Sequence, residues 1–166
     1  EIGSFATWIS SNGDAAGSLS AGYNSATGLT RAPTGGTDRD LTEAILKTVI
    51  QETYTSGGDL DMLVVPPSVK QVISGFNANT TRFGPVDVYS SDFGDINIVP
   101  NRVMATTDDK ACFLIQSDMV ATAYLRDFQM NELAKTGDSD RMQLLVEWTL
   151  EMRNEAAHAV ILDINQ

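Results

Sequence analysis

The stretch DMLVVPPSVKQVISGF, residues 61–76, changes from a strand pattern to a helix pattern. Residues 61–65 are short, apolar and rich in valine, which predicts a strand that is covered on both faces and ends at Pro66 and Pro67. Ser68 and Gln71 have the spacing of a capping box at a helix start. The apolar residues up to the closing glycine repeat at helical spacing, and they are Val69, Val72, Ile73 and Phe76. We therefore expect a strand that leads directly into an amphipathic helix.

Outward from this stretch, the sequence predicts a helix before it and strands after it. Residues 41–54 carry apolar side chains at helical spacing and are followed by two glycines, which indicates a buried helix. After residue 76 the apolar period changes to two, around a predicted hairpin turn at residues 91–94. Further strands are predicted at residues 111–116, 119–126, 142–152 and 160–164. A helical first part and a later part rich in strands indicate an α+β fold.

The longest alternation of the chain lies at residues 142–152. One side of this predicted strand carries Met142, Leu144, Val146, Trp148, Leu150 and Met152. The other side carries Gln143, Glu147, Thr149 and Glu151. The pattern predicts a long strand with one face in solvent. In the final segment, Val160, Leu162 and Ile164 are expected to share one face.

Residues 10–40 are rich in glycine, serine and threonine and offer few side chains for burial. Such a segment cannot offset its ordering entropy, so we expect a flexible loop on the outside of the protein. It separates an apolar start, residues 1–9, from the main part of the chain. Because the sequence opens at Glu1 in apolar material, we interpret it as a fragment or a processed product.

The composition excludes several classes of function. The 166 residues carry 22 acidic and 11 basic side chains, a net charge of -11, which does not favour sequence-specific or tight non-specific nucleic-acid binding. No apolar run approaches the roughly 20 residues that cross a bilayer, so no membrane partner is expected. The single cysteine, Cys112, lies in an apolar run and is interpreted as a buried side chain.

A search for catalytic patterns finds no phosphate-binding loop, no dinucleotide fingerprint and no nucleophile elbow. The only histidine, His158, lies in an apolar segment and is interpreted as structural. Three carboxylate pairs could do glycosidase-like work or hold a cation, and they are Asp59 with Asp61, Asp108 with Asp109, and Asp138 with Asp140. Their turn-like surroundings favour backbone hydrogen bonding instead. We expect no enzyme, no cofactor and no metal.

An ordered set of segments carries a resemblance to a known family. The segments are LVVPPSVKQVISGF (63–76), VDVYSSDFGDINIVPNR (86–102), LAKTGD (133–138) and EWTLEMRNEAAH (147–158). Together they resemble the C-terminal part of the major capsid proteins of tailed bacteriophages, which have the Hong Kong 97-type fold. No single segment is diagnostic, but the ordered set is specific and runs through nearly the whole chain.

The resemblance implies a domain layout. Residues 1–9 would be a remnant of the peripheral domain, residues 10–40 a loop, residues 41–129 the axial domain, and residues 130–166 the returning strands of the peripheral domain. In the family an N-terminal arm, an extended loop and a spine helix precede these parts. The chain lacks them, so a truncated form of the fold is expected.

The resemblance also implies self-assembly into the icosahedral head that encloses phage DNA. The partners would be other copies in pentamers and hexamers, with scaffold, portal or decoration proteins as further partners, and the place would be the virion, assembled in the bacterial cytoplasm. Charged turns are the candidate subunit interface: Asp92, Asp95, Arg102, Lys135, Asp138, Asp140 and Arg141. Two alternatives stay open: a carbohydrate-binding or glycoside-cleaving module, and the shell protein of a bacterial encapsulating compartment.

Overall fold

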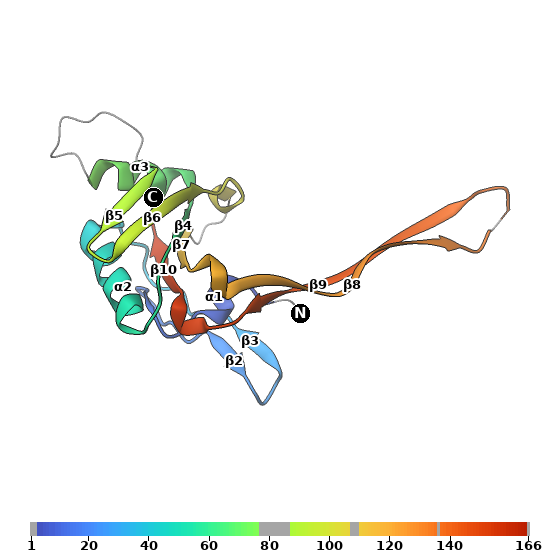
Figure 1. Ribbon diagram of the computed structural model, residues 1–166, viewed down its shortest axis with the longest axis horizontal. Coiled ribbons are helices and arrows are strands. Elements are labelled where there is room, and N and C mark those ends of the chain that lie inside the picture. Colours follow the sequence, from blue (N-terminus) through green and yellow to red (C-terminus); the bar gives the residue numbers. More distant parts are fainter. Residues whose placement is uncertain (1–2, 77–86, 107–109, 136, 166) are drawn as a thin grey trace.

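The computed structural model describes residues 3–76, 87–106, 110–135 and 137–165. Figure 1 shows a body built on a twisted sheet, from which a long two-stranded ribbon projects to one side. The sheet of the body has six strands in the order β1-β10-β7-β4-β6-β5. The α+β class predicted from the sequence is therefore confirmed.

The six strands of the body combine parallel and antiparallel pairing. Their bounds are β1 (Gly13–Asp14), β4 (Met62–Val65), β5 (Val88–Ser91), β6 (Gly94–Pro100), β7 (Lys110–Ile115) and β10 (Ala159–Ile164). β4 is parallel to β6 and antiparallel to β7, and β10 is antiparallel to β7 and parallel to β1. The predicted hairpin joins β5 to β6, with Ser91 opposite Gly94. Val86, the start of that predicted strand, lies outside the described residues.

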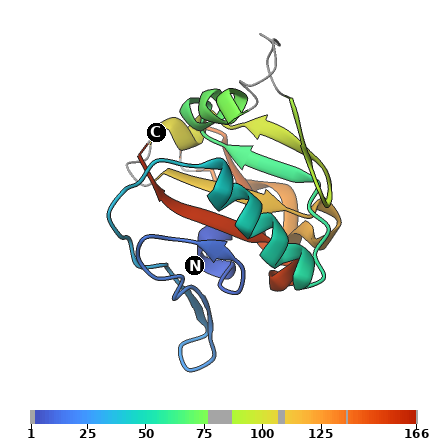
Figure 2. The same cartoon turned by 90° about the vertical axis from the view of Figure 1, so that its left-hand side faces the viewer.

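Two helices cover one face of the sheet, as the view in Figure 2 shows for α2 (Glu43–Thr55). α2 begins after Thr42, whose hydroxyl accepts a hydrogen bond from the Ile45 amide, as an N-cap does. It ends before Gly57, whose φ of +88° suits glycine. The second helix, α3 (Pro67–Phe76), starts at proline one residue before the predicted capping box, and Gly75 lies within it.

The core forms two layers, one on each face of the sheet. Alternate residues of β10 point to opposite faces, so Ile161 joins the cluster under α2 and α3 while Val160 joins the cluster beside α1 (Phe5–Trp8). The predicted common face of Val160, Leu162 and Ile164 is wrong at its last residue. Asp163 has a φ of 58° at an irregularity in the register, so Ile164 returns to the cluster under the helices. β4 was predicted to be covered on both faces. Leu63 and Val65 are buried, but Met62 and Val64 are half-buried, so one face is covered only in part.

Residues 10–40 contain more structure than the sequence predicted. β1 pairs with β10, and a Cβ at Gly13 would lie 2.2 Å from the Val160 carbonyl oxygen, so glycine is required at this approach. β2 (Gly22–Asn24) and β3 (Leu29–Arg31) form an antiparallel hairpin. The flexibility of the whole segment stays a prediction.

Two carboxylates fasten this segment to the end of the chain. Glu155 Oε1 accepts hydrogen bonds from the amides of Ser10 and Ser11, each at 2.5 Å, and its Oε2 accepts one from the Ser11 hydroxyl at 2.6 Å. Asp163 Oδ2 accepts a hydrogen bond from the Gly17 amide at 2.9 Å. Burial raises the pKa of each carboxyl, but hydrogen bonds to the charged form outweigh it and hold both pKa values below the usual range.

These lowered pKa values predict acid sensitivity. A carboxyl with a lowered native pKa stabilises the fold above its unfolded pKa of about 4, and this stabilisation is lost as the pH falls through the native pKa. Thermal melts should therefore show that Glu155→Gln lowers the melting temperature at pH 7 and that the difference shrinks towards pH 3. The exposed Glu52→Gln is the matched control and should leave the melting temperature unchanged. A loss for Glu155→Gln that does not depend on pH would contradict the account.

The ribbon consists of β8 (Val120–Leu133) and β9 (Arg141–Met152), which pair only with each other. β9 matches the predicted long strand, but β8 is longer than the predicted 119–126. Because β10 returns to the sheet of the body beside β7, the sheet crosses the expected domain boundary at residue 130. The assignment to axial and peripheral domains stays a prediction.

Among the described residues, no helix is long and apolar enough to span a membrane.

Candidate functional site

The two faces of the ribbon differ in polarity. Residues directly opposite each other in an antiparallel pair share a face. The register pairs Tyr124 with Trp148, Met130 with Leu144 and Glu132 with Met142, so their side chains lie on one face. We call the residues Tyr124, Met130, Met142, Leu144 and Trp148 the apolar ribbon face, and Glu132 borders it opposite Met142, near the ribbon tip. The opposite face carries the ion pair between Arg126 and Glu147, with 3.2 Å between Nε and Oε2.

The apolar ribbon face is open to solvent in this chain. The exposed fractions are 54% for Tyr124, 69% for Met130, 61% for Met142, 63% for Leu144 and 49% for Trp148. Burying such a side chain completely contributes about 1.5–3 kcal/mol, so covering the five would contribute on the order of 5–10 kcal/mol. A two-stranded ribbon is marginally stable alone, and a contiguous exposed apolar face marks an interaction site.

The ribbon has a fixed base on the body, where Met152 packs against the second core cluster. The carboxylate of Asp61 accepts hydrogen bonds from the amide and the hydroxyl of Ser117, just before β8. After β9, the Nδ1 of buried His158 accepts a hydrogen bond from the Gln116 amide at 3.2 Å. Burial lowers the pKa of His158, so its imidazole stays neutral near pH 7 and serves as an acceptor. The ribbon therefore leaves the body as a projection that is held at both strands.

Four of the predicted interface residues lie at the tip of the ribbon. Lys135, Asp138 and Asp140 stand between the two strands, and Arg141 is the first residue of β9. Lys135 Nζ and Asp140 Oδ1 are 2.6 Å apart, and both side chains are about seven-tenths exposed. Such an exposed pair stabilises little by itself, which leaves these charges available to set the register of a contact.

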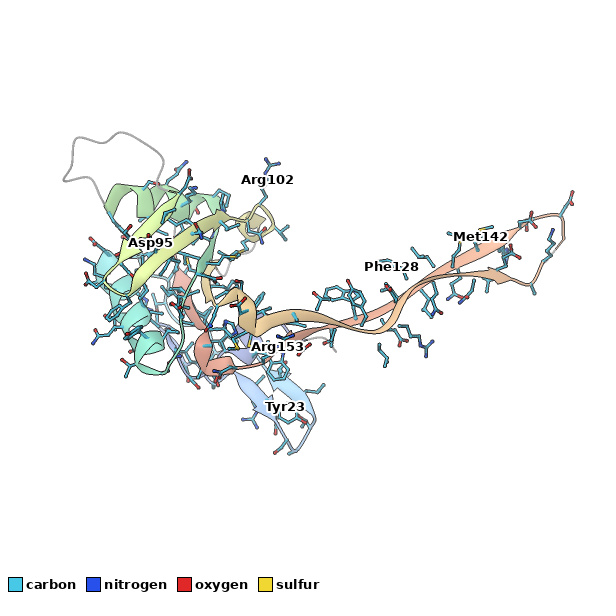
Figure 3. The ribbon with its side chains drawn as sticks, in the orientation of Figure 1. Tyr23, Asp95, Arg102, Phe128, Met142 and Arg153 are labelled. Atoms are coloured by element: carbon cyan, nitrogen blue, oxygen red, sulfur yellow. The ribbon has the colours of Figure 1, made fainter. Side chains whose placement is uncertain are left out.

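The other three predicted residues lie on the body. Asp92 is in the turn between β5 and β6, Asp95 is in β6, and Arg102 follows the other end of β6. Figure 3 shows that Asp95 and Arg102 are on the body, far from Met142 on the ribbon. The seven charges therefore lie at three separate places, which are the ribbon tip, the β5–β6 turn and the far end of β6, rather than in one site.

The apolar residues of β8 are the part of this face that the sequence reasoning missed. The alternation of β9 was recognised, with Met142, Leu144 and Trp148 on its apolar side. The side chains of β8 that lie opposite them were not identified. The clue lay in β8, where Phe128 and Leu125 stand at breaks in the register and are 63% and 83% exposed. Figure 3 shows Phe128 near the middle of the projecting ribbon.

One carboxylate of each described pair makes a structural contact. Asp61 binds Ser117, and Asp140 binds Lys135, while Asp108 and Asp109 lie outside the described residues. Within the described part of the chain, no group of three or more His, Cys, Asp or Glu residues is placed to hold a metal ion.

Cys112 is buried in the cluster under the helices. Burial raises the pKa of its thiol to about 12, so the reactive thiolate is scarce at pH 8. We expect iodoacetamide at pH 8 to leave the native chain unmodified and to label it once in denaturant. Mass spectrometry checks this, and rapid labelling of the native chain would contradict the described burial.

Residues 1–165 match the family model described as SU10 major capsid protein. No curated protein sequence matches the chain. The holo-SrpI encapsulin complex from Synechococcus elongatus PCC 7942 has a TM-score of 0.51 at 11% identity, over 72% of this chain and 48% of that chain.

Two further solved structures are similar at lower scores. A structure from Mycobacterium phage Ogopogo has a TM-score of 0.49 at 11% identity, over 96% of this chain and 62% of that chain. A virus-like particle from Pyrococcus furiosus has a TM-score of 0.38 at 15% identity, over 75% of this chain and 55% of that chain. The chain spans about half the length of the encapsulin chain.

Proposed function

Because the chain belongs to the SU10 major capsid protein family, we propose that it is part of a structural protein that assembles with copies of itself into the icosahedral head of a bacteriophage. The family match over residues 1–165 carries this proposal. The Hong Kong 97-type fold predicted from the sequence is confirmed by the family and by the likeness to the encapsulin structure.

The ribbon supplies the physical means of assembly. A shell subunit needs a rigid body and projecting elements that reach its neighbours, and each heterologous contact must repeat around a closed arrangement. The body has a two-layered core, and the ribbon holds an apolar face in solvent at a fixed base. In the shell, neighbouring copies cover the apolar ribbon face, and the charges at the ribbon tip set the register of that contact.

We also propose how the copies group, which other proteins they meet and what their charge does. The copies group into pentamers and hexamers in the host cytoplasm, and scaffold, portal or decoration proteins act on the finished or growing shell. The net charge of -11 suits a wall from which packaged DNA is released. We expect no catalytic activity, and the contacts of Asp61 with Ser117 and of Asp140 with Lys135 support a structural role for these two carboxylates.

Expression of the complete gene product tests the proposal. Sedimentation and negative-stain microscopy should show closed shells of uniform size. A gene product that stays monomeric in assembly buffers, or that binds or cleaves glycans in a sugar array, would contradict the proposal. A shell-forming compartment protein is the second candidate because of the encapsulin likeness, and it would be indicated by shells that package protein instead of DNA.

A further inference from the structure

A groove lies between α2 and the turn of the β5–β6 hairpin. Its volume is about 450 Å³, and its lining includes Glu43, Lys47, Ile50, Tyr89, Asp92 and Phe93. It stands at the free edge of the six-stranded sheet, because β5 is the last strand there. A concave surface at a sheet edge is suited to receive a projection from another protein.

The chemistry of the groove favours a cation. Glu43 Oε1 and Lys47 Nζ are 2.7 Å apart, so these two charges balance. Asp92 makes no ion pair with the described residues, and although its charge also acts on Lys47, the three groups together leave one net negative charge in the groove. Phe93 contacts Tyr54 in a tilted ring pair with 4.7 Å between the ring centroids, and the two residues are partly exposed, at 39% and 55%. A carboxylate beside an exposed ring is the setting in which a guanidinium both pairs and stacks.

The other end of β6 carries a complementary projection. Arg102 is exposed and makes no ion pair within the described ranges, and the next residue, Val103, is 76% exposed. The side chain of Asn101 holds this bend, since its Oδ1 accepts a hydrogen bond from the Val103 amide at 3.0 Å. Figure 3 shows the Arg102 side chain extending outward from the body. An arginine beside an exposed aliphatic residue matches an acidic groove with aromatic and aliphatic walls.

The two features cannot meet within one copy, because they lie beyond opposite ends of the same strand. We propose that Arg102 and Val103 of one copy occupy the groove of a second copy, with the guanidinium between Asp92 and Phe93. The contact is heterologous, since the two copies contribute different surfaces, and its repetition generates a ring. This inference rests on the proposed function and names the contact within a capsomer.

The other described arginines are held or placed elsewhere. Arg39 pairs with Asp14, Arg126 with Glu147, and Arg153 with Glu151. Arg141 lies at the ribbon tip, in the contact already proposed for the ribbon. Arg31 is exposed on the β2–β3 hairpin, where its neighbour Leu29 is 45% exposed, less than Val103. Arg31 therefore provides the matched control, because it is an exposed arginine that is absent from the proposed contact.

Charge exchange in the complete gene product tests the contact. Asp92→Arg and Arg102→Asp should each lower the yield of closed shells about tenfold or more, measured by sedimentation. The combined variant, which carries both changes, should recover most of the yield because the pair is restored in reversed order. Arg31→Asp should assemble like the unchanged protein. Circular dichroism melts of each variant check that the subunit folds.

The outcomes separate this inference from the proposed function. If the unchanged protein forms no shells, the proposed function fails. If it forms shells and the two single changes have no effect, the inference alone is wrong. Folded single variants that fail to assemble and are not rescued by the combination also overturn it, as does a loss in Arg31→Asp that equals the loss in Arg102→Asp.

Discussion

Replacing Leu144 by aspartate in the complete gene product should abolish closed shells while the subunit remains folded. Leu144 lies in the middle of the apolar ribbon face, opposite Met130 and four residues from Trp148. It is 63% exposed in the chain, so a charge there is hydrated in the free subunit. When a neighbour covers this face, the carboxylate loses its water without gaining a partner, which costs several kcal/mol at every copy. Sedimentation and negative-stain microscopy measure the shells.

Gln143→Asp is the matched control for this change. Gln143 is the adjacent residue and lies on the opposite, polar face of the ribbon, where it pairs with Asn131. The control should assemble, and both variants should melt at the temperature of the unchanged subunit. Normal shells from Leu144→Asp would contradict the proposed role of the apolar ribbon face. A large loss of melting temperature in the free subunit would show that the same subunit covers this face.

Replacing Ile161 by alanine should lower the free energy of unfolding by about 2–5 kcal/mol. Ile161 has no solvent exposure and lies in β10, an interior strand of the sheet, where it faces the helices. The loss combines the transfer free energy of the removed carbons with the cavity that close packing cannot refill. Urea denaturation followed by circular dichroism measures the change.

Val99→Ala serves as the control for the core substitution. Val99 lies in β6 of the same sheet, but 40% of it is exposed, so we expect a loss below about 1 kcal/mol. If Val99→Ala lowered the free energy of unfolding as much as Ile161→Ala, the described burial of Ile161 in β10 would be contradicted.

Local patterns predicted the elements of the body well. The helix at residues 43–55 follows from apolar side chains at helical spacing between Thr42 and Gly57, and both ends have a local physical cause. The β5–β6 turn also follows from short-range preferences, because Gly94 has a φ of +141°. Such features are encoded within a few residues and need no knowledge of the rest of the chain.

Long-range pairing could not be predicted in the same way. β1 is only two residues long, and its place depends on β10, whose partner residue Val160 is far along the chain. Neither segment alone carries a preference for the other. The same limit explains residues 10–40, where carboxylates of Glu155 and Asp163 supply the contacts that the loop itself lacks.

The candidate interface combines charged turns with an apolar face, and the role of its charged turns stays a prediction. Charged turns were recognised because glycine and opposite charges stand together at Lys135 to Arg141 and around Asp92. What covers the apolar ribbon face could not be predicted, because alternation indicates a strand with two unlike faces but does not say what lies against the apolar one. Leu144 and Trp148 have the same pattern whether a helix, a sheet or another copy lies against them.

Electron cryomicroscopy of particles formed by the complete gene product tests the central claim most directly. The account predicts closed shells in which each ribbon reaches from its own body to a neighbouring copy, with Leu144 and Trp148 buried against that copy. Particles in which the apolar ribbon face remains in solvent, or a gene product that forms no closed particles, would contradict it.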